Sequence, residues 1–262
     1  HVLEPPRRNS AQTSTNPLEW EMQRTNARRH LDGISEEHGT SELPVETELL
    51  EGRVEEEIRA WVTGHQVDLT VLCSHGANGW TEQGLASTAK KLIDRLSGPT
   101  LLVPASVLQE LPKKEVRYER ILVPLDASPR AETALTLATR LAREQGSELV
   151  LIHVVPVPEL TGPDPLDDQE LDLKRRLIDR NTRVAENYLA RLRDRVADQG
   201  LRVRTVLAHD DVRFELLRCI EDERPSLIVI SGHGRGGRTA LRLGSVASFL
   251  LEHAAAPTLI VR

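Results

Sequence analysis

The chain contains an internal repeat, and this repeat constrains its fold more than any other feature. Residues 71–76 (Val-Leu-Cys-Ser-His-Gly) correspond to residues 229–234 (Val-Ile-Ser-Gly-His-Gly) at a spacing of 158 residues, and residues 98–103 correspond to residues 256–261 at the same spacing. Such self-similarity indicates a structural unit that is present twice. A chain of 262 residues has room for two domains of ordinary size. We therefore expect two copies of one fold.

The repeat also defines the expected domain limits. We predict a first domain over residues 1–110 and a complete second domain over residues 119–262, with a short charged linker between them. His1 matches His153, at the end of a strand, with a spacing of 152 residues. Aligned in this way, the first copy lacks its first strand, its first helix and most of its second strand. We interpret the chain as a fragment of a longer protein.

The second copy begins with a strand, a helix and another strand. Residues 120–126 form a short apolar run that ends in a carboxylate, which is typical of a buried strand. Ser128 suits the N-cap of a helix, Pro129 its first turn and Gly146 its left-handed C-terminus. Residues 148–155 are again almost continuously apolar. The three elements therefore predict a βαβ unit with parallel strands.

Strands and helices continue to alternate toward the C-terminus. Further strands are predicted over residues 202–207, 227–230 and 258–261, and further helices over residues 170–197, 212–223 and 245–253. This alternation predicts an α/β fold with a doubly wound parallel sheet of the Rossmann-like type, in two tandem copies. Ligands of such sheets bind outside the carboxyl ends of the strands, where the strand order reverses.

The composition excludes several classes of protein. The net charge is -6 with mixed acidic and basic residues, so there is no basic stripe for a nucleic acid backbone. Two cysteines cannot form a disulfide framework or a cysteine-rich zinc site. No apolar stretch is long enough to span a membrane, and the N-terminus does not have the pattern of a signal peptide. We expect a cytoplasmic protein.

A glycine-rich segment follows the strand predicted over residues 227–230. It reads Ser-Gly-His-Gly over residues 231–234, and after nine further residues Gly244 and Ser245 open the last helix. Glycines let backbone N–H groups come close to a ligand, and a helix N-terminus offers donors and partial positive charge to a phosphate. Arg235 adds a cation. No Gly-Lys-Ser or Gly-Lys-Thr follows the glycines, which excludes a Walker A loop.

With these features the second copy resembles the universal stress protein family over residues 121–262. The family pattern is Gly, two residues, Gly, nine residues, and then Gly with Ser or Thr. Here Ser231 replaces the first glycine, whereas Gly234, Gly244 and Ser245 match the pattern.

The resemblance implies a site for ATP or a related adenine nucleotide in the second copy. In family members that bind ATP, an Asp at the end of the first strand and an apolar residue after a strand-two His hold the adenosine part, and Asp126 and Val154 match them. The glycine loop and the Ser hold the ribose and the phosphates, which Mg²⁺ can accompany. The predicted binding residues are Pro124, Asp126, Val154, Ser231, Gly234, Arg235, Gly244, Ser245 and Val246.

The first copy departs further from the family pattern. Its loop reads Cys73, two residues, Gly76, nine residues, and then Ala86 and Ser87, so two of the three glycines are replaced. A Cβ atom at Ala86 would stand where a phosphate must approach. We expect no nucleotide in this copy of the chain.

The sequence predicts no catalytic residues and no metal ligands. His75 and His233 each stand at a strand end without a Cys, Asp or second His at ligand spacing, so we expect structural hydrogen bonds for both. A phosphorylated Asp126 would need a companion acidic pair and a later Lys, and neither is present at a clear position. We expect a binding protein rather than an enzyme, while slow ATP hydrolysis stays open.

Two kinds of function fit these features. The first is a nucleotide-binding regulatory protein of the stress response. The second is a nucleotide-free interaction module of the same fold, or the cytosolic tail of a larger protein such as a membrane transporter. The apolar last strands, residues 100–103 and 258–261, resemble the edge through which family members pair antiparallel. We therefore expect the two copies to associate within the chain, with a homodimer as a further option.

Overall fold

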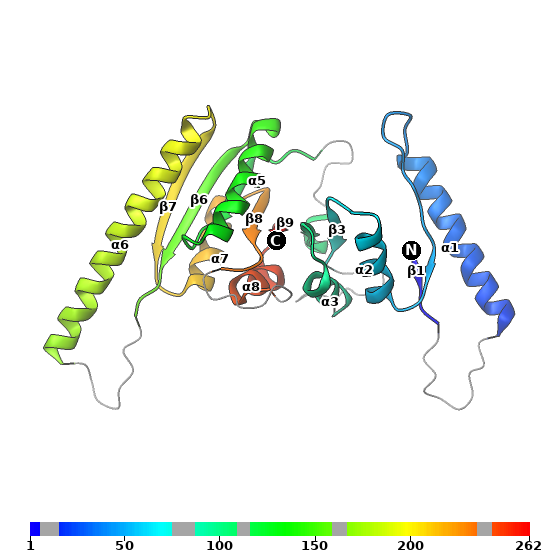
Figure 1. The fold of residues 1–262 in the computed structure, drawn as a ribbon, viewed down its shortest axis with the longest axis horizontal. Helices are drawn as coiled ribbons and strands as arrows, with labels where there is room; N and C mark the ends of the chain where they lie inside the picture. Colours follow the sequence, from blue (N-terminus) through cyan, green and yellow to red (C-terminus); the bar gives the residue numbers. More distant parts are fainter. Residues whose placement is uncertain (6–15, 75–86, 109–115, 159–166, 235–242) are drawn as a thin grey trace. The chain divides into compact units, whose positions relative to one another are not determined.

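The structure, a computed structural model, describes residues 1–5, 16–74, 87–108, 116–158, 167–234 and 243–262. These residues form two compact units, His1–Val67 and Asp68–Arg262 (Figure 1). None of the helices in the described ranges is long and apolar enough to cross a bilayer.

The first unit contains a small parallel sheet and two helices. Its elements are β1 (Val2–Leu3), α1 (Pro17–His38), β2 (Leu50–Glu51) and α2 (Val54–Gly64). Strands β1 and β2 pair in parallel. Helix α1 begins after Asn16, whose side chain accepts a hydrogen bond from the backbone N–H of Leu18. An ion pair of 2.7 Å between Arg24 and Glu51 joins α1 to β2.

The second unit is built on a seven-stranded sheet with the order β3-β4-β9-β8-β5-β6-β7. The strands are β3 (Thr70–Cys73), β4 (Thr100–Val103), β5 (Arg120–Pro124), β6 (Glu148–Val155), β7 (Arg202–His209), β8 (Leu227–Ser231) and β9 (Thr258–Val261). All neighbouring strands are parallel except β4 and β9. The doubly wound, mostly parallel α/β sheet predicted from the sequence is confirmed.

The antiparallel pair joins the two sequence repeats. In its register Thr100 faces Ile260, and Leu102 faces Thr258. The last strands of the two copies therefore associate inside this chain, as expected from their resemblance to the pairing edge of the family. Because of this pairing, β3 and β4 lie in the second compact unit although they belong to the first repeat. The domain limits derived from the repeat stay a prediction.

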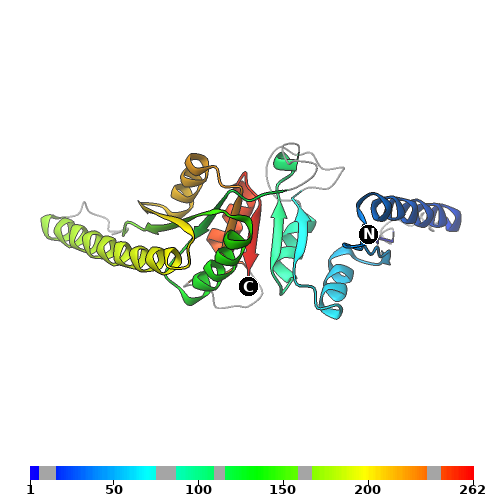
Figure 2. The same ribbon diagram turned by 90° about the horizontal axis from the view of Figure 1, so that it is seen from above.

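Helices cover both faces of the sheet. The helices of this unit are α3 (Ser87–Arg95), α4 (Ala105–Leu108), α5 (Pro129–Gln145), α6 (Asp168–Ala197), α7 (Val212–Glu223) and α8 (Ser245–His253). Along β5, Ile121 and Val123 pack with α5 and α6, whereas Leu122 packs with α7 and α8. Successive side chains of a strand point to opposite faces, so a strand covered on both sides is apolar throughout. Figure 2 shows α5 and α6 on one side of the strands and α7 on the other.

Local sequence signals determine where these helices begin and end. Ser128 accepts a hydrogen bond from the backbone N–H of Ala131, and Gly146 has the left-handed φ of 68°. Helix α6 begins with a capping box between Asp167 and Glu170. These caps fix the ends of α5 and the start of α6 relative to the sheet.

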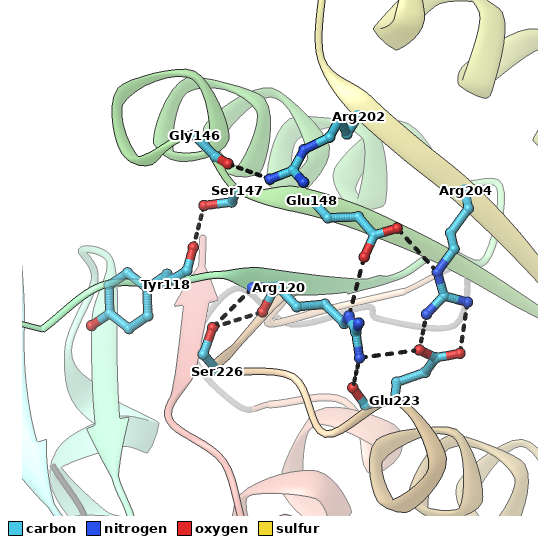
Figure 3. A network of polar contacts seen from close by, with 9 residues as sticks. All are labelled: Tyr118, Arg120, Gly146, Ser147, Glu148, Arg202, Arg204, Glu223 and Ser226. Atoms are coloured by element: carbon cyan, nitrogen blue, oxygen red, sulfur yellow. Dashed lines mark hydrogen bonds and ion pairs between the residues drawn. The ribbon is translucent and has the colours of Figure 1, made fainter.

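Charged side chains tie together the amino ends of the strands in a closed network (Figure 3). Glu148 forms ion pairs with Arg120 at 3.2 Å and with Arg204 at 3.3 Å. Glu223, at the end of α7, forms an ion pair with Arg120 at 3.7 Å and accepts a 2.7 Å hydrogen bond from Arg204. The Oγ of Ser226 accepts from the backbone N–H of Arg120 and donates to its carbonyl. The network fixes β5, β6 and β7 at the end opposite their carboxyl termini.

Candidate functional site

The strand order of the second unit reverses between β5 and β8. Strand β6 pairs with β5 on one side and β8 pairs with it on the other. The connections after β5 and β8 therefore leave in different directions, which opens a crevice at the carboxyl ends of these strands.

A cavity of about 610 Å³ lies at this crevice. Its volume is within the roughly 300–1,000 Å³ that is usual for small-molecule sites. The structure brings together at this cavity every predicted binding residue that it describes. They are Pro124, Asp126, Val154, Ser231, Gly234, Gly244, Ser245 and Val246. Arg235 lies outside the described residues.

One wall of the cavity is apolar. Ile152 and Val154 come from β6, Ile230 comes from β8, and Val212 and Leu216 come from α7. The wall supplied by α7 was not predicted from the sequence, although its amphipathic pattern predicts an apolar face. A flat heteroaromatic ring fits an apolar wall of this kind, because burial of its faces removes apolar surface from water.

Asp126 lies in the turn between β5 and α5. Its Oδ1 accepts a 3.0 Å hydrogen bond from the backbone N–H of Ser128. Ala127, which lies between them, has a φ of 59°. The left-handed conformation is uncommon for a residue with a Cβ atom, and such strain is concentrated at functional sites. The turn therefore holds the Asp126 carboxylate at the cavity.

The same carboxylate explains why residue 234 is a glycine. A Cβ atom on Gly234 would lie closer than 3.0 Å to Oδ2 of Asp126 and 3.3 Å from its Cγ. Real Cβ contacts essentially never fall below 3.0 Å. The glycine loop and the carboxylate are therefore packed directly against each other.

Ser231, which replaces the first glycine of the family pattern, organises the loop itself. Its Oγ donates a 2.7 Å hydrogen bond to the carbonyl of His233 and accepts from the backbone N–H of the same residue at 3.4 Å. The next residue, Gly232, donates its backbone N–H to the carbonyl of Val261 at 2.8 Å. The substitution therefore adds a side-chain turn to a loop that is also attached to β9.

Gly244 connects this loop to α8. It is the N-cap residue, it has no side-chain capping bond, and its N–H donates to the carbonyl of Gly232 at 2.8 Å. An added Cβ would meet Gly232 at 3.6 Å and His233 at 3.8 Å, which is ordinary contact. Because no side chain among the described residues caps α8, the first N–H groups of this helix are available beside the glycine loop. This arrangement is suited to an anion.

Two histidines line the cavity, and the sequence predicts only structural hydrogen bonds for His233. The Nδ1 of His153 lies 2.7 Å from the carbonyl oxygen of Leu125, and its ring contacts Tyr188 edge-on. His233 is 8% exposed, and its Nε2 has no hydrogen-bond partner among the described residues. Among the lining residues that the structure describes, Asp126 is the one carboxylate.

The loop of the first copy begins like that of the second. Ser74 donates its backbone N–H to Val103 at 2.9 Å, as Gly232 does to Val261. The Ser74 side chain instead accepts from the backbone N–H of Ala105. Gly76 and Ala86 lie outside the described residues, so the absence of a nucleotide from this copy stays a prediction.

Comparison with known proteins agrees with the repeat. The model of the universal stress protein family matches residues 1–104 and 117–262. A universal stress protein of Bacillus subtilis is 28% identical over 151 residues, which are 55% of this chain and 99% of that protein. A universal stress protein of Mycolicibacterium smegmatis is 29% identical over 237 residues, which are 88% of this chain and 72% of that protein.

The fold also agrees with that of a solved structure. The crystal structure of a universal stress protein from Archaeoglobus fulgidus has a TM-score of 0.68 to this chain, at 17% identity, over 100% of this chain and 85% of that one. At this level of identity the similarity concerns the fold alone. Since the family model matches both repeats over nearly their whole length, the chain belongs to the universal stress protein family.

Proposed function

We propose that the second copy binds an adenine nucleotide such as ATP, and that this binding regulates the protein in a stress response. The observation that carries the proposal is the cavity itself, which combines an apolar wall, a glycine loop and the uncapped start of α8. An adenine nucleotide has the matching parts, namely an apolar base at one end and phosphate groups at the other.

Each part of the ligand has a partner in this arrangement. The base lies against Ile152 and Val154, with Asp126 within reach of its polar edge or of the ribose. The phosphates lie at Gly234 and Gly244, where backbone N–H groups and the positive end of the α8 dipole stabilise negative charge. Mg²⁺ accompanies the phosphates through their own oxygens and water.

We further propose that the ligand is bound rather than rapidly consumed. Fast hydrolysis needs a group that positions or deprotonates the attacking water. The sequence contains no Walker A lysine, and the family resemblance implies a binding function.

The test is isothermal titration of the 262-residue chain with ATP, AMP and GTP in the presence of Mg²⁺. We expect one site per chain and a preference for adenine over guanine. The matched variants are Gly244→Ala, at the N-cap of α8, and Ser248→Ala, within α8, of which only the first lines the cavity. Among the residues that the structure describes, the new Cβ of Gly244→Ala meets no atom closer than 3.6 Å, so its loss of affinity reports on the ligand rather than on folding.

Two outcomes would reject the proposal. Folded protein that gives no binding heat with any of the nucleotides would leave the nucleotide-free interaction module as the better account. Equal affinity of wild type and Gly244→Ala would show that phosphate does not approach the start of α8.

A further inference from the structure

His153 is a polar residue in an otherwise apolar part of β6. Between Glu148 and the end of the strand at Val155, every other side chain is apolar. Its neighbours Ile152 and Val154 belong to the cavity wall. Successive side chains of a strand point to opposite faces, so the imidazole lies on the other face, where α5 and α6 pack. An apolar residue would satisfy the packing on this face, and the histidine therefore requires a further explanation.

The ring of His153 is held by two contacts. Its Nδ1 lies 2.7 Å from the carbonyl oxygen of Leu125, just past the end of β5. A carbonyl oxygen only accepts hydrogen bonds, so Nδ1 carries the proton and donates it. The ring also contacts Tyr188 of α6 edge-on, with 5.9 Å between the ring centroids. Since Tyr188 is buried, the imidazole is held between a fixed ring and the backbone of Leu125.

The bonded carbonyl belongs to the turn that carries Asp126. Leu125 also donates its backbone N–H to the carbonyl of Ile152 at 2.9 Å, so both of its backbone polar groups are bonded to β6. Asp126 follows directly, and its Oδ1 accepts the hydrogen bond from Ser128. Ala127 between them has the left-handed φ of 59°, a conformation that persists only when the surrounding structure imposes it. The bonds to Leu125 anchor the start of this turn.

We propose that His153 is a positioning residue of the nucleotide site. Its Nδ1–H holds the carbonyl of Leu125, and this bond fixes the direction in which the Asp126 carboxylate meets the ligand. The inference rests on the proposed function and adds to it a residue that acts through Asp126. Without the bond the turn relaxes toward less strained conformations, and the carboxylate leaves the orientation that the bound nucleotide needs.

The experiment is isothermal titration of ATP, with Mg²⁺, on the 262-residue chain and its variants at residue 153. His153→Leu fits the apolar surroundings of this face and removes the donor. A hydrogen bond from a ligand to a charged group contributes roughly 10-fold or more to affinity, so we expect a loss of about 5–10-fold. The amide nitrogen of Asn stands where Nδ1 does, whereas that of Gln stands near Nε2. We therefore expect His153→Asn to recover most of the affinity and His153→Gln to recover little.

A double-mutant cycle tests whether His153 acts through Asp126. In an Asp126→Ala background the carboxylate is absent, and His153→Leu should change ATP affinity by less than about twofold. A residue that only supports the fold would weaken binding by the same factor in both backgrounds.

The matched control is His209→Leu. His209 also lies at the carboxyl end of its strand, β7, and its ring bonds to another element, through Thr182 of α6 at 2.9 Å. It is not among the described residues that line the cavity. We expect this variant to bind ATP with the affinity of the wild type.

The outcomes separate this inference from the proposed function. Equal ATP affinity of wild type and His153→Leu would reject the inference and leave the nucleotide site standing. The same loss with and without Asp126 would show that the imidazole does not act through the carboxylate, and would reject it too. Folded wild type that binds no nucleotide would reject both proposals.

A second measurement applies if His153→Leu does not fold. The chain has nine histidines, and ¹⁵N-histidine labelling separates protonated from unprotonated ring nitrogens by NMR. His153→Asn identifies the His153 signals by their absence. We expect a proton on Nδ1 with and without ATP, because the carbonyl of Leu125 accepts it in both states. An unprotonated Nδ1 would overturn the inference.

Discussion

The contact between Asp126 and residue 234 makes a quantitative prediction about folding. A Cβ on Gly234 would come closer than 3.0 Å to Oδ2 of Asp126. The carboxylate can escape only by rotation, and rotation breaks the 3.0 Å hydrogen bond that its Oδ1 accepts from Ser128. The cost of Gly234→Ala is therefore about the value of that charged hydrogen bond, roughly 1.5–3 kcal/mol.

Thermal unfolding without ligand provides the measurement. For a unit of this size, 1 kcal/mol corresponds to about 2–4 °C in the midpoint, so we expect Gly234→Ala to lower the midpoint by about 4–8 °C. In an Asp126→Ala background the hydrogen bond is already absent, and the same substitution should cost less than about 0.5 kcal/mol. The double-mutant cycle thus predicts a coupling of about 1–2 kcal/mol.

Two other glycines of the site serve as controls. A Cβ on Gly232 would meet side-chain atoms at 3.3 Å, whereas one on Gly244 would meet no atom of the described part of the chain closer than 3.6 Å. The loss of stability should follow the order Gly234→Ala, Gly232→Ala, Gly244→Ala. If the costs of Gly234→Ala and Asp126→Ala simply add within about 0.5 kcal/mol, the carboxylate is not what requires a glycine at position 234.

Four further substitutions test the packing of the sheet and of the site. Glu223→Gln removes the charge shared by two arginines in Figure 3 and should destabilise by about 1 kcal/mol in urea unfolding, less in 1 M NaCl because the arginines are partly exposed. Val229→Ala, at a fully buried position of β8, should lower the free energy of unfolding by about 2 kcal/mol. Val71→Ala, at the corresponding position of the first repeat with 58% exposure, should lower it by under about 0.5 kcal/mol. Equal losses would contradict the difference in burial between the two positions. Ala127→Gly relieves the φ of 59° and should raise the thermal midpoint by about 1–2 °C, so a lower midpoint would argue against strain in this turn.

Short-range patterns were sufficient to predict most of the second copy. The apolar run at residues 120–124 is buried on both faces of β5, and Ser128 and Gly146 occupy the caps expected of them. These features depend on neighbours within a few residues, where steric and hydrogen-bonding preferences are the same in any fold. The glycine spacing likewise identified the loop and the start of α8, because the family resemblance indicates which positions would approach a ligand.

The sequence by itself therefore determined the repeat, the α/β class, the positions of most strands and helices, and the candidate site residues. The resemblance to the family also predicted the association of the last strands, β4 and β9, within the chain. Only the tertiary structure decided that α7 supplies a wall of the cavity and that His233 is buried beside α8. It also revealed that Asp126 excludes a side chain at position 234. These features depend on contacts between residues far apart in the chain, and neither hydrophobic period nor motif spacing specifies such contacts.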